Sequence, residues 1–424
     1  MRTSWLWLGV SFVFVPVFTA GRAQVPASAS TIVWRTDWNA AREEAGRSGK
    51  PLFVLLRCPQ TKSAQTASLP VEQPTDKELQ TLLSTHYVPV RLHSLKDADL
   101  NTLRFDYDLT LAGLVVDGRD RTVLARWGVG GDAPMSDRYN VSSLKAMLDA
   151  GALVYQKRAP GVSPPPVQTI TERYPAFATS RRAGEPCYHC HYVHDAALAD
   201  ARTNNTFEKS WLYLFPPPQN IGVTLDPNRG NVVTSVAPDS PAQRARVRPG
   251  DVITQVNQTL IYTTADFSWA LNAISNNATT NHLTLHLVRD NKPLAPVTLT
   301  MPPNWKAYDI SWRPSQGAVG PILGTWEEPV PSAERAALGL SATSLALRVT
   351  TLFSGPKWEP THGDLRVGDI FVAVGNKALP DLSARQFHSY VRMHYNVGGS
   401  IAFTVLRDGK RITVPVSAVN VSLE

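Results

Sequence analysis

In the second half of the chain, residues 248–253 read Arg248-Pro249-Gly250-Asp251-Val252-Ile253, and residues 366–371 read Arg366-Val367-Gly368-Asp369-Ile370-Phe371. Residues 288–290 and 406–408 form a second matching pair, Val288-Arg289-Asp290 and Leu406-Arg407-Asp408. In both pairs the second stretch follows the first by 118 residues. Two separate matches at one offset predict a duplicated domain. Each copy is predicted to hold short strands, a Gly-Asp turn into a strand, a closing hairpin and one helix, at about residues 264–275 and 383–395.

Both copies resemble PDZ domains, and the first carries the fuller signature. Its stretch Val236-Ala237-Pro238-Asp239-Ser240-Pro241-Ala242, followed by Arg248–Asp251, is similar to the S-P-A … G-D pattern of PDZ domains in bacterial periplasmic proteases. The residues at the place of the carboxylate-binding loop are Asn220, Ile221, Gly222 and Val223. The resemblance implies that a peptide C-terminus adds as a strand after this loop, whose N–H groups hold its carboxylate, with the helix from Thr264 as the other wall.

The second copy departs from this pattern. Leu338-Gly339-Leu340 offers a loop, but Gly355-Pro356-Lys357-Trp358 stands in place of Ser-Pro-Ala, which puts peptide binding in doubt. For both copies the alternative is a structural β-rich module with a filled groove. The chain has no G-x-S-x-G and no Ser, His and Asp set in a domain of suitable size, so the resemblance does not bring proteolysis with it.

The first half alternates helix and strand signals. A helix capped by Asp37 runs through Ser48, a helix with a capping box begins at Thr75-Asp76-Lys77-Glu78, and a last amphipathic helix opens at Ser142. Strands are predicted at Leu52–Leu56, Tyr87–Leu92, Ala112–Val116 and Val123–Trp127, the last two as a hairpin.

This order, with Lys50-Pro51 leading into the first strand, resembles the thioredoxin-like fold over residues 31–156. The chemistry of that family is missing, because Thr61-Lys62-Ser63-Ala64 stands where a thioredoxin has its dithiol. The family's proline before the hairpin is missing too, since no proline lies between Pro89 and Pro134. Cys58 is then a buried small residue or a peroxide-sensitive or mixed-disulfide thiol. We expect a redox-silent thioredoxin-like domain used for binding or architecture.

Near the middle of the chain, Cys187-Tyr188-His189-Cys190-His191 spells C-x-x-C-H, the attachment motif of a c-type haem. Cys187 and Cys190 would each add to a vinyl group of one porphyrin, and His191 would ligate the iron. The sixth ligand stays open. His194 follows His191 by three residues and is expected on the same side of the ring, and Met135, Met147, Met301 and Met393 are the other candidates. Two alternatives compete with haem c: a zinc site of Cys187, Cys190, His191 and His194, and a disulfide or dithiol of the two cysteines.

The segments between these units are predicted as connectors. Residues 157–186 are rich in proline, arginine and small residues, which is typical of a semi-extended linker, and this linker with the haem motif spans residues 157–210. The fold class is therefore multidomain, with an α/β thioredoxin-like domain followed by two PDZ-like β-rich α+β domains. These PDZ-like domains span residues 211–302 and 331–424, and an ordered connector covers residues 303–330.

The start of the chain predicts export. Arg2, the short apolar run Trp5–Phe18 and Gly21-Arg22-Ala23 indicate a signal peptide over residues 1–23, with an uncleaved membrane anchor as the alternative. The protein is then periplasmic or secreted, and three cysteines are too few for a disulfide framework. Of the 424 residues, 18% are charged and 43% hydrophobic, which is typical of a folded protein. The net charge of +7 is spread out without a dense Lys/Arg block, which argues against nucleic-acid binding.

As a whole, the chain resembles a family of exported bacterial thioredoxin-like/PDZ proteins, some of whose members are selenoproteins. That resemblance implies a redox or peptide-binding theme. We predict a periplasmic, non-enzymatic adaptor with one haem c, which binds peptide C-termini and relays or senses an electron. The alternatives are a thiol-disulfide oxidoreductase or chaperone that uses Cys187 and Cys190, and a purely structural scaffold.

Overall fold

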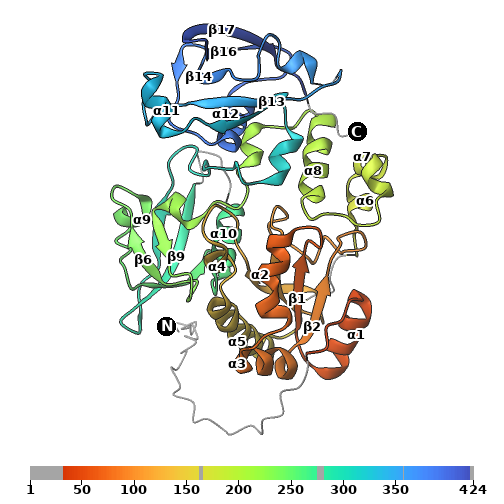
Figure 1. Ribbon diagram of the computed structural model, residues 1–424. Coiled ribbons are helices and arrows are strands. Elements are labelled where there is room, and N and C mark those ends of the chain that lie inside the picture. The colour runs from red at the N-terminus through yellow and green to blue at the C-terminus, as the bar shows by residue number, and fades with distance from the viewer. Residues whose placement is uncertain (1–31, 162–165, 275–280, 357, 421–424) are drawn as a thin grey trace, which may run out of the picture.

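The computed structural model describes residues 32–161, 166–274, 281–356 and 358–420. The predicted signal peptide lies outside these ranges. Figure 1 shows the sheet of an α/β unit with its helices at the bottom (residues 32–157), a first β-rich unit at the left (residues 218–301) and a second β-rich unit at the top (residues 325–420). The helices of residues 170–203 lie at the right, between the α/β sheet and the top unit. Among the described residues, no helix has both the length and the apolar character needed to cross a membrane.

The α/β unit is built on a four-stranded sheet with the strand order β2-β1-β3-β4. The strands β1 and β2 run parallel, whereas β3 is antiparallel to both of its neighbours, β1 and β4. Their bounds are Leu52–Arg57 for β1, Val88–Leu92 for β2, Leu111–Asp117 for β3 and Thr122–Trp127 for β4. The predicted strands and the hairpin are confirmed.

Side chains alternate between the two faces of this sheet, so each face has its own core. Phe53 and Leu55 of β1 pack in one cluster with residues from the helices α2 (Lys62–Glu72), α3 (Lys77–Thr81) and α5 (Val141–Lys157). Leu52, Val54 and Leu56 pack in the other cluster with helix α1 (Trp38–Ser48). A π-helical turn, η1 (Leu82–His86), and a short helix, α4 (Met135–Arg138), complete this part.

The N-terminal caps of two helices, α3 and α5, differ from the predicted ones. Asp37 caps α1 and Gly49 ends it, as predicted. Helix α3 is capped by Asp76 rather than by Thr75, because the Asp76 carboxylate accepts the N–H groups of Glu78 and Leu79. Helix α5 is capped by Asn140 rather than opened at Ser142. In both cases the side-chain oxygen of an Asp or Asn residue accepts two free N–H groups of the first turn.

The predicted semi-extended linker, residues 157–186, is wrong for residues 170–184, which are largely helical. Residues 170–203 fold into short helices against the α/β unit. These are α6 (Ile170–Arg173), α7 (Pro175–Ala178), η2 (Arg181–Gly184) and α8 (Tyr192–Thr203). Ile170, Phe177, Tyr188, Tyr192 and Val193 are buried in the same cluster as α1. Apolar side chains spaced among the arginines make burial more favourable than an extended path.

The first β-rich unit contains two sheets, one with the order β10-β9-β7-β8 and β11 paired to β9, and one of β5 and β6. The strands are β5 (Val223–Leu225), β6 (Val233–Val236), β7 (Val252–Val256), β8 (Thr259–Leu260), β9 (His282–Arg289), β10 (Lys292–Pro293) and β11 (Val297–Thr300). The helices are η4 (Pro218–Ile221), α9 (Pro241–Arg244) and α10 (Thr264–Asn272). A short helix, η3 (Lys209–Leu212), precedes this unit.

The second β-rich unit has one sheet with the order β12-β13-β14-β16-β17 and β15 paired to β14. The strands are β12 (Thr325–Pro329), β13 (Leu347–Leu352), β14 (Ile370–Val374), β15 (Lys377–Ala378), β16 (Ser400–Arg407) and β17 (Lys410–Ser417). The helices are α11 (Ser332–Ala337), η6 (Glu359–Thr361) and α12 (Ala384–His394), and η5 (Pro314–Ala318) lies in the preceding connector.

The offset of 118 residues seen in the sequence recurs in the elements themselves. It separates the first residues of β7 and β14, of β8 and β15, and of β9 and β16. The matched motifs form the same ion pair in each unit: Arg289 Nε donates to Asp251 Oδ1 and Arg407 Nε donates to Asp369 Oδ1, both at 2.7 Å. Each aspartate also accepts a backbone N–H three residues before it. The ion pair therefore joins the turn before β7 to the end of β9 in the first unit, and the turn before β14 to the end of β16 in the second.

We expect Asp251→Asn and Asp369→Asn each to lower the free energy of unfolding by about 2 kcal/mol, because each removes charge-assisted hydrogen bonds from a buried carboxylate. Chemical denaturation of the full chain measures this. Asp290→Asn and Asp408→Asn are the matched controls, since both residues adopt a positive φ that asparagine tolerates. Equal losses in test and control variants would show that the repeated ion pair does not stabilise the units.

Candidate functional site

The predicted loop at Asn220–Val223 is a tight turn between η4 and β5. Gly222 adopts a φ of +87°, and its N–H donates to the Gln219 carbonyl at 2.9 Å. Ile221 and Val223 point into the core of the unit and are fully buried. The side-chain amide of Asn220 donates to the Trp305 carbonyl at 2.8 Å. The four residues lie together as predicted, but one N–H expected to hold a carboxylate is bonded within the turn.

The strand that follows this turn has an open edge. Within the described residues β5 pairs only with β6, so its other edge carries no strand. Helix α10 packs against η4 and buries Phe267 and Leu271 in the core of the unit. Thr264 and Ser268 are only half-buried on another face of the helix. A free strand edge and a helix beside it are the two parts that strand addition of a peptide requires.

A cavity of about 430 Å³ adjoins the turn and the helix. Gln219 and Asn220 line it from the turn, and Ser268 and Trp269 line it from α10. The α/β unit supplies the loop after β4, Gly128–Ala133, and Trp312 of the connector covers another side. A mainly apolar cavity with a few polar groups is typical of a ligand site. The α/β unit therefore contributes part of the wall.

Helix α10 is fixed to the α/β unit by buried polar contacts. The backbone N–H of Arg126 donates to Asp266 Oδ1 at 2.8 Å, the Thr263 hydroxyl donates to the Arg126 carbonyl, and the Arg126 guanidinium stacks 3.8 Å from the centre of the Trp269 ring. Burial lowers the pKa of Arg126 to about 10. Burial also raises the pKa of Asp266 to about 7, although Arg126 and three backbone N–H donors favour its charged form.

Comparisons with known proteins identify this unit. Residues 219–297 match the family described as PDZ domain. The chain contains a PDZ domain. No curated protein matches the chain. The turn at Asn220–Val223, the strand β5 and the helix α10 all lie within the matched residues of the PDZ domain.

Solved structures similar to this chain include two of one protease. "HtrA-type protease AlgW with decapeptide" is 14% identical with a TM-score of 0.21, over 33% of this chain and 50% of that one. "HtrA-type protease AlgW with tripeptide" is 14% identical with a TM-score of 0.23, over 42% of this chain and 55% of that one. The chain thus spans about half the length of these structures. Together with the PDZ domain, the four sheets of the described residues make this a multidomain α/β protein with β-rich units.

In the second β-rich unit the corresponding space is bridged by side chains. His388 Nε2 of α12 lies 2.8 Å from Glu327 Oε2 of β12, and Trp326 packs against the same imidazole. The predicted loop Leu338-Gly339-Leu340 ends helix α11, where the Leu340 N–H donates to the Arg335 carbonyl at 2.8 Å. A peptide would have to displace the buried contact between His388 and Glu327 to enter between β12 and α12.

The C-x-x-C-H residues lie in the turn that leads into α8. Cys187 Sγ lies 3.4 Å from the His93 carbonyl, and Cys58 Sγ lies 3.5 Å from His189 Nδ1. His191 Nδ1 lies 3.1 Å from Asp195 Oδ2. Cys190 packs against the apolar core of the α/β unit. Burial raises the pKa of Cys190 to about 12, and the nearby thiols of Cys58 and Cys187 add to this rise.

The surroundings of these residues do not fit a haem. Tyr188 and Tyr192 flank the thiols and are buried, and both rings pack on Phe177. Three cavities stand out in the described ranges, and none is lined by Cys187, Cys190 or His191. A porphyrin bonded to both thiols would need the space that the tyrosine rings and the core now fill.

The other proposed ligands of this segment also lie elsewhere. His194 is buried, and its Nδ1 lies 3.2 Å from Asp108 Oδ2. No three of the four residues of the zinc alternative bring their ligand atoms within 4.8 Å of one another in the described part of the chain. The candidate methionines pack in other clusters, Met135 and Met147 with α5, Met301 in the PDZ core and Met393 beside the connector.

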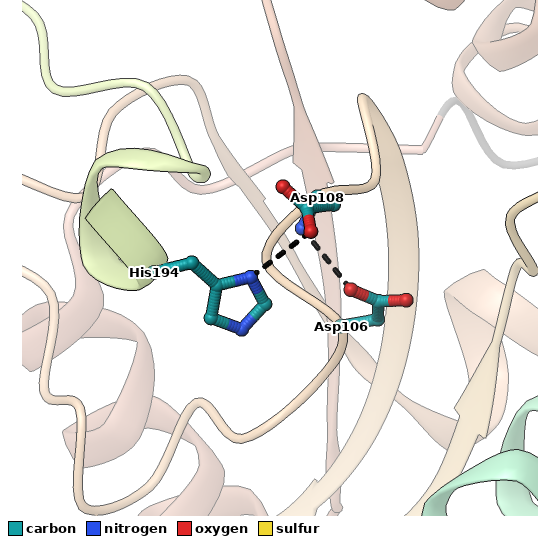
Figure 2. Close-up of side chains that lie close together, drawn as sticks. All are labelled: Asp106, Asp108 and His194. Atoms are coloured by element: carbon teal, nitrogen blue, oxygen red, sulfur yellow. Dashed lines mark hydrogen bonds and ion pairs between the residues drawn. The ribbon is translucent and has the colours of Figure 1, made fainter. Parts of the chain in front are cut away.

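A group that the sequence did not predict connects the units. Asp106, Asp108 and His194 bring their ligand atoms within 4.8 Å of one another, and Figure 2 shows His194 and Asp106 on either side of Asp108. The buried guanidinium of Arg313 donates to both carboxylates, to Asp106 at 2.8 and 2.9 Å and to Asp108 at 2.8 Å. Because Arg313 already supplies the positive charge, we interpret the group as an ion network that holds the units together.

Proposed function

We propose that this protein is an exported adaptor whose PDZ domain captures the free C-terminus of a partner peptide. The observation that carries the proposal is the open edge of β5, which directly follows the turn η4 on which α10 packs, together with the 430 Å³ cavity at that turn. In this arrangement a peptide extends the sheet through main-chain hydrogen bonds with β5. Its last side chain enters the cavity, whose walls include Trp269 and Trp312.

The carboxylate of the peptide would meet the turn at Ile221, Gly222 and Val223. The Gly222 N–H leaves the Gln219 carbonyl and donates to the carboxylate, which is the stronger acceptor because it is charged. Arg126 lines the cavity and adds a positive charge near this end. The apolar walls favour a large apolar last residue over a charged one.

The remaining units serve architecture in this proposal. The strand order β2-β1-β3-β4, with one parallel pair and the helices on both faces, supports a thioredoxin-like fold for the α/β unit. The shared offset and ion pair support a second PDZ-like domain, whose groove is filled by His388 and Glu327. The periplasm or the outside of the cell stays the predicted location. Haem c and electron relay stay predictions that would require the Tyr188 and Tyr192 rings to move.

The test is peptide binding by the full chain. A library of peptides with random free C-termini should yield binders with a large apolar last residue. Amidation of a selected peptide should weaken its binding about tenfold or more, because charge-assisted hydrogen bonds to the carboxylate are lost. Fluorescence anisotropy with matched free and amidated peptides measures the difference. Equal affinity of the two forms, or a library without binders, would contradict the proposal.

A further inference from the structure

Cys58 lies at a defined place in the α/β unit. It follows the last residue of β1 directly and precedes α2, whose cap is Thr61. Its backbone N–H donates to the Thr110 carbonyl at 2.8 Å, just before β3. Cys58 is half-buried, so its thiol is held between two strands without being sealed in the core.

The C-x-x-C turn folds back onto this place from far along the sequence. The Tyr188 N–H donates to Ser94 Oγ at 3.0 Å, and the Tyr188 carbonyl accepts the Leu95 N–H at 3.1 Å. These bonds bring His189, between the two cysteines, to 3.5 Å from the Cys58 thiol. All three cysteines of the chain thus gather at one end of the sheet, although Cys58 and His189 are 131 residues apart.

We propose that Cys58, Cys187 and Cys190 form one thiol-disulfide exchange site, in which Cys58 bonds reversibly to a cysteine of the C-x-x-C turn. The inference does not depend on peptide capture by the PDZ domain. It assigns a partner to Cys58, which the sequence interpretation treated as a lone thiol. It also replaces the redox-silent interpretation of the α/β unit, because the second thiol comes from the turn before α8.

The oxidant in this exchange is the disulfide form of a partner thiol compound, which is reduced while the protein thiols are oxidised. The Cys58 thiolate attacks one sulfur of that disulfide, a mixed disulfide forms, and one partner thiolate leaves and takes up a proton. A thiolate of the C-x-x-C turn then attacks Cys58 Sγ, and the second partner thiolate leaves. Two protein thiols become one disulfide, and the partner disulfide becomes two thiols. His189 Nδ1 is close enough to Cys58 to accept its proton in the first step.

The influence of the neighbouring thiols on Cys190 agrees with this geometry. Cys58 raises the pKa of Cys190 more than Cys187 does, after the larger effect of burial. A buried thiol with a raised pKa is a poor attacking group on its own, so Cys58 rather than Cys190 starts the exchange.

The experiment is disulfide mapping on the full chain. The native protein is incubated with oxidised glutathione, quenched by alkylation in acid and digested with trypsin without reduction. Cleavage after Arg57 and Lys62 isolates Cys58, whereas cleavage after Arg182 and Arg202 keeps Cys187 and Cys190 in one peptide. We expect a linked pair of these two peptides in mass spectra, and its loss in Cys58→Ser. The link should form much faster in the native protein than in urea.

Other results would overturn the inference. These are an internal Cys187–Cys190 disulfide with Cys58 freely alkylated, haem thioethers on the peptide that carries both cysteines, and thiols protected by a bound metal ion. A link that forms equally fast in native and unfolded protein would overturn it as well. Thermal unfolding of Cys58→Ser is the control for folding, and its midpoint should stay near that of the wild type.

Discussion

Replacing Arg313 with methionine is expected to lower the free energy of unfolding by about 3–5 kcal/mol, the largest effect we expect from any single change. The Arg313 guanidinium is buried and holds Asp106 and Asp108 of the α/β unit. It also donates to the Leu214 carbonyl ahead of the PDZ domain, at 2.5 Å. Methionine keeps most of the volume but leaves the buried Asp108 carboxylate and the partly buried Asp106 carboxylate without their cation. Chemical denaturation followed by tryptophan fluorescence measures the loss.

Two variants show whether the loss comes from the uncompensated charges. Adding Asp106→Asn and Asp108→Asn to Arg313→Met should restore part of the stability, because the neutral amides no longer need a cation. Arg47→Met removes an exposed arginine paired with Glu43 at 3.7 Å and should change stability by less than about 0.5 kcal/mol. If Arg313→Met is as mild as Arg47→Met, the network does not hold the units.

The same network predicts how acid acts on the protein. Burial alone would raise the pKa of Asp108, but His194 and Arg313 together hold it below its usual range. A depressed pKa stabilises the folded state above the unfolded value of about 3.9, and this stabilisation is lost as the pH falls further. The stability of Arg313→Met should therefore fall less steeply in acid than that of the wild type.

Gly222→Ala is expected to weaken peptide binding about tenfold or more and to destabilise the PDZ domain by about 1–3 kcal/mol. A Cβ at this position would lie 2.1 Å from Ser240 Cβ and 2.3 Å from Ser240 Oγ. Ser240 cannot simply turn away, because its hydroxyl caps α9 and donates to the Ala237 carbonyl at 2.7 Å. The turn must shift, and the N–H groups that meet the carboxylate shift with it.

Gly250→Ala is the matched control for this variant. Gly250 has nearly the same φ, +89°, but a Cβ there would meet nothing within 4 Å. Its cost is therefore backbone strain alone, about 1–2 kcal/mol, and the peptide affinity should stay unchanged. Anisotropy titration with one selected peptide compares the two variants. Equal affinities would mean that the turn at Gly222 does not hold the ligand.

The sequence predicted the parts of the fold that depend on neighbouring residues. The strand β1 is a continuous apolar run because both of its faces are buried, and such a run is visible without a structure. The duplication was also visible, because Asp251 and Arg289 recur as Asp369 and Arg407 to make the same ion pair. The PDZ signature could be recognised because Gly222 and Ser240 are both part of it. They lie so close together that only glycine fits at position 222.

What the sequence did not predict depends on residues far apart in the chain. Nothing near Cys58 indicates that His189 will lie 3.5 Å away, and nothing near Arg313 indicates its two aspartates. The prediction of an extended linker was wrong for the same reason. The apolar residues of this segment pack against the core of the α/β unit, which is formed by residues far away in the sequence. The cavity was missed because its walls come from three separate segments.

The contact between Arg126 of the α/β unit and Asp266 of the PDZ domain has a consequence for experiments on the isolated PDZ domain. An excised PDZ domain would lack strand β4, on which α10 packs. It would also lack the loop Gly128–Ala133, which lines the cavity. A fragment screen would then select ligands for a strand edge alone. In the proposed mode of peptide capture, the ligand preference would belong to the assembled chain, because the PDZ domain supplies the strand β5 and the α/β unit supplies part of the cavity wall.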